Sequence, residues 1–134
     1  MGRVPVHDQP HSQMVNSHRP HCPHMSNAKM TPELLTLIAD RFKVLAEPAR
    51  LQILQALRAG ERSVSELAQA TGLGQANLSK HLKSLHEGGF VDRHREGLFV
   101  IYRLADGDVF RICDLMCGRL EELSTQRRKL LARR

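Results

Sequence analysis

The chain has 134 residues, 41% of them hydrophobic, which allows one folded domain with a modest core. Its formal net charge of +6 suits a polyanionic partner such as nucleic acid but does not by itself indicate one. No segment approaches the roughly 18 uninterrupted apolar residues that a membrane span needs, and the N-terminus lacks a signal-peptide pattern, so we expect a cytoplasmic protein with no membrane partner. Its three cysteines are then expected as free thiols rather than as a disulfide framework.

Residues 1–30 are predicted to be a disordered tail. They hold five of the eight histidines and four of the six prolines, and they show no hydrophobic periodicity. Such a stretch buries too little apolar surface to offset the entropy cost of ordering it. An alternative is that the tail binds nickel, copper or zinc, because imidazoles are common ligands. The irregularly spaced candidate ligands are His7, His11, His18, His21, Cys22 and His24.

Two helices are predicted after this tail. The first begins at Thr31-Pro32-Glu33, since proline is tolerated in a first turn and an acidic residue favours a helix N-terminus. Pro48 ends that helix and opens the second. The apolar residues of the two helices are Leu34, Leu35, Ile38, Phe42 and Leu45, and then Leu51, Ile53, Leu54 and Leu57.

A helix-turn-helix is predicted next. Ser63 and Glu66 have the spacing of a capping box, which starts a short third helix that Gly72 ends. A fourth helix, from about residue 75 to 86, has Leu78, Leu82 and Leu85 at spacings of four and three. Two short helices joined this closely are typical of a helix-turn-helix.

A β-hairpin and a last helix complete the predicted domain. Residues 90–95 and 98–103 are expected to pair across a Glu96-Gly97 turn, forming a wing with a basic tip. The last helix starts near Asp106 or Asp108 and carries an apolar stripe that needs a partner: Val109, Ile112, Cys113, Met116, Leu120 and Leu123. We therefore expect a mainly α fold with a small β-hairpin wing over residues 31–126, and a basic C-terminal tail over residues 127–134.

Polar side chains on the outer face of the fourth helix are the candidate DNA-binding residues. When the leucines face inward, the residues turned outward are Gln75, Asn77, Ser79, Lys80 and Lys83. Amide side chains can pair with an adenine edge, and lysine reaches guanine or phosphate. Arg93 and Arg95 of the hairpin, with His94 between them, would contact phosphates or a minor groove. For any one of these residues, a merely solvated surface position is the alternative.

The sequence also resembles the ArsR/SmtB family of winged helix-turn-helix repressors, roughly from Leu34 to Leu123. Five segments carry the resemblance: FKVLAEPARLQIL at residues 42–54, SELA at 65–68, NLSKHLKSL at 77–85, GFV at 89–91 and YRL at 102–104. The resemblance implies a homodimer joined through its first and last helices, repression at double-stranded operator DNA, and release when an inducer binds. Two recognition helices about 34 Å apart would then read a palindrome.

The inducer is not fixed by the resemblance. Members of this family often bind thiophilic metals at a Cys-x-Cys pair, but the matching stretch, Ser63-Val64-Ser65-Glu66, has no cysteine. Others bind zinc between the last helices through Asp and His ligands. The similar positions here are Asp106, Asp108, Arg119 and Glu122, and arginine is not a zinc ligand.

Cys113 and Cys117 remain as the candidate inducer site, because residues four apart on a helix share one face. Two thiolates there can chelate As(III), Sb(III), mercury or cuprous copper, with Cys22 or a cysteine across the dimer as a third ligand, and no resident cofactor is required. The pair can alternatively form a sulfenic, disulfide or polysulfide species, which makes it a redox or reactive-sulfur sensor. Plain hydrophobic packing is the third interpretation.

Other function classes have weaker support. There is no glycine-rich phosphate loop and no GxSxG elbow, so we do not expect an enzyme. A sequence-tolerant nucleoid-type protein would use the basic C-terminal segment as a phosphate clamp. An interaction module that kept the fold without binding DNA is a further alternative.

Overall fold

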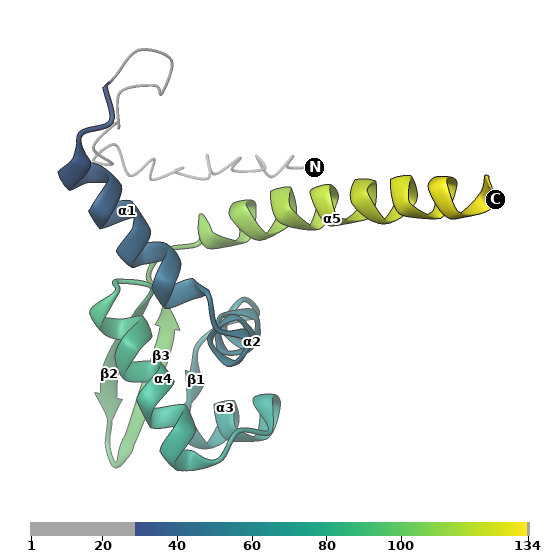
Figure 1. Ribbon diagram of the computed structural model, residues 1–134. Helices are drawn as coiled ribbons and strands as arrows, with labels where there is room; N and C mark the ends of the chain where they lie inside the picture. Colours follow the sequence, from purple (N-terminus) through teal and green to yellow (C-terminus); the bar gives the residue numbers. More distant parts are fainter. Residues whose placement is uncertain (1–28, 134) are drawn as a thin grey trace, which may run out of the picture. The chain divides into compact units, whose positions relative to one another are not determined.

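A computed structural model of the chain describes residues 29–133. The chain divides into two units, residues 1–31 and 32–134, and the second holds every described helix and strand. The predicted disorder of the tail and the candidate ligand Cys22 therefore lie outside the described residues. The elements follow in the order α1 (Pro32–Leu45), α2 (Pro48–Leu57), β1 (Arg62–Ser63), α3 (Val64–Thr71), α4 (Gln75–Glu87), β2 (Val91–Glu96), β3 (Phe99–Leu104) and α5 (Val109–Ala132) (Figure 1).

The helix boundaries follow from local chemistry that the sequence displays. α1 and α2 both begin at a proline, Pro32 and Pro48. Before α3, the Glu66 amide donates to Ser63 Oγ at 3.2 Å, and the Ser63 amide donates to Glu66 Oε1 at 3.1 Å. α3 ends at Thr71, and its C-cap residue Gly72 has a left-handed φ of 70°. The predicted capping box and the glycine stop are therefore confirmed.

The sheet has three antiparallel strands in the order β1-β3-β2, one more than the predicted hairpin. The register of β2 and β3 places Glu96 opposite Phe99, so the loop is Gly97-Leu98 and not the expected Glu96-Gly97. The reason is the turn geometry. A two-residue loop of type II′ needs its glycine at the first loop position, and Gly97 has a φ of 60°.

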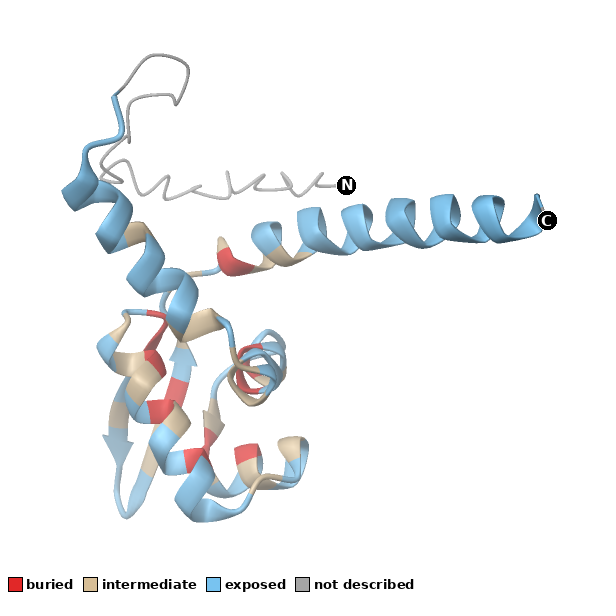
Figure 2. Ribbon diagram, in the orientation of Figure 1, coloured by how far each residue is buried: buried red, intermediate tan, exposed pale blue. Residues whose placement is uncertain are grey.

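One hydrophobic core joins α2, α3, α4 and the sheet. Buried residues, red in Figure 2, gather in these elements. Leu78, Leu82 and Leu85 are each at most 1% exposed, so α4 has a fully packed face. The rest of the core is Ile53, Leu54, Leu57, Leu67, Phe90, Val91, Tyr102 and Val109.

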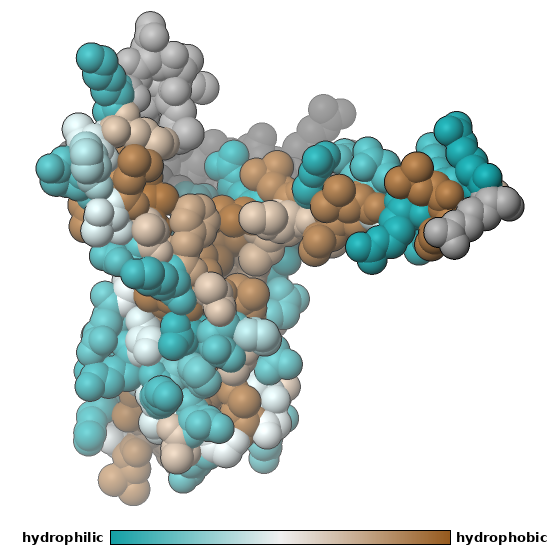
Figure 3. Space-filling view, viewed as in Figure 1, coloured by the Kyte–Doolittle hydropathy of each residue, from teal (hydrophilic) through white to brown (hydrophobic). Residues whose placement is uncertain are grey.

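α5 is packed only at its start. Val109 is buried and Cys113 packs against the core, but every described residue from 114 onward is exposed. The helix continues to Ala132, through most of the segment expected to be a basic tail. Hydrophobic side chains stay uncovered along its length, as the brown surface in Figure 3 shows: Ile112, Leu115, Met116, Leu120, Leu123, Leu130 and Leu131.

α1 shares this property, with Leu34, Leu35, Leu37 and Phe42 all exposed. Among residues 29–133, most of the exposed large hydrophobic side chains therefore lie on the first and last helices. Within residues 29–133, no helix combines the length and the hydrophobicity that a membrane crossing requires.

Candidate nucleic-acid interface and thiol pair

α4 presents the predicted DNA-contacting side chains on its open face. With the three leucines packed inward, Gln75, Asn77, Ser79, Lys80 and Lys83 are all exposed. Lys83 Nζ lies 3.9 Å from Glu87 Oε1, an exposed pair that leaves the ammonium accessible. The N-cap is Gly74, which has no side chain to cap the first turn, so the N-terminal amides can donate to a phosphate.

A hydrogen bond between Arg50 of α2 and His81 of α4 joins the two helices, and the sequence alone did not predict it. Arg50 Nε donates to His81 Nδ1 at 3.2 Å, and Arg50 Nη1 donates to the Val44 carbonyl at 3.1 Å. His81 and His86 are both half-buried. Arg50 therefore fixes the position of the recognition helix against the end of α1 and the start of α2.

The wing brings one of its two predicted DNA-contacting arginines close to α4. Arg93 lines a cavity together with Ser79 and Lys83, so these three predicted site residues converge on one surface. Arg95 is exposed nearer the hairpin loop. Two uncovered hydrophobic side chains lie at the tip of the hairpin, Leu98 in the loop at 96% and Phe99 at the start of β3 at 62% exposed. Neither was among the predicted DNA-contacting residues.

Three side chains of types that bind metal ions lie together on β2 and just before β1. One ligand atom from each of Glu61, His94 and Glu96 falls within 4.8 Å of the other two. His94 Nε2 is 3.1 Å from Glu96 Oε1, so the ring already has a carboxylate partner. All three side chains are accessible to water, and such groups are common without a metal.

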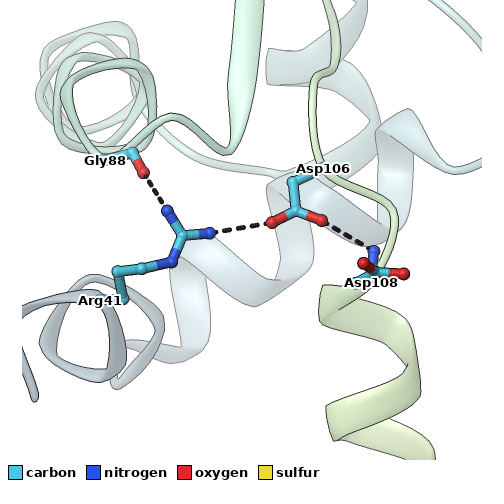
Figure 4. A network of polar contacts seen from close by, with 4 residues as sticks. All are labelled: Arg41, Gly88, Asp106 and Asp108. Atoms are coloured by element: carbon cyan, nitrogen blue, oxygen red, sulfur yellow. Dashed lines mark hydrogen bonds and ion pairs between the residues drawn. The ribbon is translucent and has the colours of Figure 1, made fainter. Parts of the chain in front are cut away.

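Arg41 connects three segments that are distant in sequence (Figure 4). Its Nη1 donates to the Gly88 carbonyl at 3.0 Å, and its Nη2 donates to Asp106 Oδ2 at 2.9 Å. The guanidinium lies over the Phe90 ring, 4.3 Å from the centroid. Asp106 Oδ1 accepts from the Asp108 amide at 2.9 Å, which orders the start of α5. Arg41 therefore links α1, the end of α4 and the segment before α5.

The two cysteines of α5 lie on one cavity. Cys113 is half-buried and Cys117 is exposed, and both are free thiols. They line a cavity of about 680 Å³ together with residues of α2 and the last turn of α3. Cys117 Sγ lies 4.0 Å from Glu121 Oε1, a weak contact at that distance. The third proposed ligand, Cys22, is outside the described residues.

Comparison with known proteins identifies a consistent group of relatives. A family model described as "Bacterial regulatory protein, arsR family" matches residues 47–93. The biofilm growth-associated repressor of Xylella fastidiosa is 35% identical over 77% of this chain and 90% of that protein. A helix-turn-helix transcriptional regulator of Mycobacterium tuberculosis is 43% identical over 62% of this chain, but the match spans only 37% of that longer protein.

Solved structures give the same result. A homodimeric winged helix-turn-helix DNA-binding domain from Mycobacterium bovis has a TM-score of 0.61 and 36% identity, covering 77% of this chain and 95% of that one. The antimony-specific transcriptional repressor AntR has a TM-score of 0.64 and 30% identity, covering 81% and 97%. Reduced HlyU from Vibrio cholerae has a TM-score of 0.56 and 34% identity, covering 66% and 92%. The relatives named as regulators or repressors are transcription factors and not enzymes.

Proposed function

This chain belongs to the arsR family of bacterial regulatory proteins, and we propose that it is an operator-specific repressor whose inducer binds the thiols of Cys113 and Cys117. As a member of that family, it is a winged helix-turn-helix transcriptional repressor that binds DNA as a homodimer, and it is not an enzyme. The proposal places it in the cytoplasm, where bacterial operator DNA lies. It further assigns the base-reading residues and the class of inducer.

Base reading is assigned to the open face of α4. The observation that carries this assignment is that α4 has one fully buried leucine face and an opposite face of exposed amide, hydroxyl and ammonium groups. In this proposal, Gln75 and Asn77 pair with adenine edges, whereas Lys80 and Lys83 contact guanine or phosphate. Arg93 and Arg95 extend the contact to phosphates beside the recognition helix.

Selection of binding sites from random duplex DNA, followed by footprinting, tests this assignment. We expect one palindrome whose half-sites are centred about 10 base pairs apart or a multiple of that. Replacement of Asn77 by alanine should relax the preference at one position of each half-site, while Arg95→Ala should weaken binding to all sequences alike. Even coverage of random DNA would instead support the nucleoid-type alternative.

We assign inducer binding to the thiols of Cys113 and Cys117. Both thiols line the same cavity as residues of α2 and α3, so a bound soft ion would lie directly against the helix-turn-helix. The similarity to an antimony-specific repressor supports a thiophilic metalloid, As(III) or Sb(III), as the inducer class. Cys22 remains a proposed third ligand.

Titration of the protein-operator complex with antimonite and arsenite tests the inducer assignment. We expect release of the DNA from the wild-type protein, and retained DNA binding without release for the Cys113→Ser and Cys117→Ser variants. Induction that survives in both variants would exclude the thiol pair as the sensor.

Reactive-sulfur or redox sensing is the second candidate. Cys117 is exposed, which allows oxidants and persulfides to reach its sulfur, and a solved relative is described in a reduced state. Release by polysulfide but not by antimonite, with a polysulfide link between Cys113 and Cys117 found by mass spectrometry, would favour this candidate over metalloid sensing.

A further inference from the structure

The cavity beside the thiol pair has a wall that inorganic arsenite or antimonite would not use. Its volume is about 680 Å³, far more than one ion and its two sulfur ligands would fill. Most of the wall is apolar and comes from α2, the end of α3 and the start of α5. The apolar lining residues include Pro48, Leu51, Leu54, Ala70, Val109 and Phe110.

The number of sulfur ligands limits which metalloid species fits. Trivalent arsenic and antimony form three bonds, and the inorganic ions reach a stable thiolate complex with three sulfurs. Among the described residues, only Cys113 and Cys117 supply a thiol. A metalloid that already carries one carbon substituent needs only two sulfurs, and this pair, one helical turn apart, provides two.

We propose that this site binds a monosubstituted trivalent organoarsenical, with arsenic held by Cys113 and Cys117 and the organic group against the apolar wall. The inference rests on the proposed thiol-based induction and names the ligand class. In the binding step, R-As(OH)₂ reacts with the two Cys-SH groups to give R-As(S-Cys)₂ and two waters. Two As-O bonds are replaced by two As-S bonds, each thiol proton leaves with a hydroxide, and arsenic stays trivalent.

The polar groups at the cavity leave room for such a substituent. Arg58 also lines the cavity, and it stacks on Phe110 with its guanidinium carbon 4.7 Å from the ring centroid. Asp114 lies between the two cysteines in sequence but is exposed, so its carboxylate remains hydrated. Gln52, Gln55 and Thr71 also line the cavity, but most of the surface that remains for the organic group is hydrophobic, and covering it contributes favourably to binding.

The position of the cavity explains how such a ligand would act on DNA binding. Thr71, which lines the cavity, donates through its hydroxyl to the Leu67 carbonyl at 2.7 Å and accepts from the Leu73 amide at 3.4 Å. These bonds hold the turn that leads from α3 to α4. An organic group against Ala70 and Thr71 would therefore press directly on the helix-turn-helix connection.

The test compares phenylarsine oxide with arsenite and antimonite as agents that release the full-length dimer from its selected operator, followed by fluorescence anisotropy. We expect phenylarsine oxide to release the DNA at a concentration at least ten-fold lower than arsenite. Mass spectrometry should find one phenylarsenic group per chain, and none in the Cys113→Ser or Cys117→Ser variant.

A wall variant tests the organic subsite separately. Ala70→Leu fills the cavity beside α3 and should raise the phenylarsine oxide concentration needed for release, with little change for arsenite. Gln69→Leu, an exposed neighbour that does not line the cavity, is the matched control and should behave as wild type. Equal effects of Ala70→Leu on both agents would overturn the organic subsite.

Two further outcomes separate this inference from the proposed function. If arsenite or antimonite acts at concentrations equal to or below those of phenylarsine oxide, and Cys22→Ser abolishes that action, the site is a three-sulfur inorganic sensor. The organoarsenical inference then fails while thiol-based induction stands. If none of the three agents releases the operator, both metalloid sensing and the inference fail.

Discussion

Arg41 uses one guanidinium for a hydrogen bond to Gly88, an ion pair with Asp106 and a stacking contact with Phe90. Its side chain is 49% exposed, so water screens the ion pair with Asp106 and reduces the contribution of that pair to the free energy of unfolding. The hydrogen bond to Gly88 and the cation-π contact with Phe90 are therefore expected to contribute more to stability than the screened ion pair. The residue matters because these contacts converge where the recognition helix ends and the thiol-bearing helix begins.

Replacing Arg41 by alanine should lower the free energy of unfolding by about 2 kcal/mol, the sum of one hydrogen bond and one cation-π contact. Asp106→Asn, which removes only the charge of the partner, should cost less than about 1 kcal/mol. Urea denaturation of both variants measures the difference. Equal losses would mean that the ion pair, and not the other contacts, accounts for the effect of Arg41.

The Ser63-Glu66 capping box gives a pH-dependent prediction. Hydrogen bonds from the Ser63 amide and hydroxyl, helped by the nearby charge of Arg62, hold the pKa of Glu66 below its ordinary value. A lowered folded-state pKa stabilises the fold above the unfolded-state pKa, and this contribution is lost as the pH falls through the folded value. Ser63→Ala should cost about 1 kcal/mol at pH 7 in urea denaturation. The stability gap between wild type and Glu66→Gln should narrow on acidification to pH 3, and a gap that widens would contradict the prediction.

One face of α4 packs in the core and the other is proposed to contact DNA. Substitutions on the first face should therefore change stability, and substitutions on the second should change operator binding. Leu82 is 1% exposed, and its replacement by alanine should lower the free energy of unfolding by about 2 to 5 kcal/mol. Asn77 is exposed, and Asn77→Ala should change stability by less than about 0.5 kcal/mol while weakening operator binding by about 1 to 3 kcal/mol. Urea denaturation and anisotropy on the same samples separate the two effects. A large stability loss in Asn77→Ala would show that its side chain packs rather than reads bases.

The elements that the sequence predicted are those whose signals are local. Leu78, Leu82 and Leu85 repeat at helical spacing, and Ser63 with Glu66 sets a helix start within four residues. β1 was not predicted, because a strand of two residues is too short to show a periodic pattern. Its pairing also depends on Ile101 and Tyr102, which belong to a later strand. The hairpin loop was misplaced by one residue because the sequence shows where Gly97 lies but not which loop position it takes.

The site was predictable to the same extent. The outward positions of α4 follow from the leucine spacing alone. The contact of Arg41 with Asp106 spans 65 positions of the chain, and the cavity beside Cys113 needs three elements to form it. No local pattern reports such contacts, so the residues that position the site were found only in the folded chain.

A single chain leaves hydrophobic side chains of α1 and α5 uncovered. α5 leaves the core after Cys113 and carries a row of uncovered leucines, and α1 exposes Leu37 and Phe42 at 64% and 50%. Exposed hydrophobic surface of this extent is typical of an interface. Homodimerisation, shown by the family, explains why both helices keep these side chains while contributing little to the core of one chain.

Leu120→Glu tests this division between core and interface. Leu120 is 65% exposed, so a carboxylate there should leave the folded chain intact but should be costly against a second apolar helix. We expect a monomer by sedimentation equilibrium, helical circular dichroism close to that of wild type, and loss of binding to the palindromic operator. Thr125→Glu adds the same carboxylate to the opposite face of α5 and should remain a dimer that binds the operator. A dimeric Leu120→Glu protein would show that α5 does not hold the subunits together, and the two recognition helices would then need another scaffold to reach adjacent grooves.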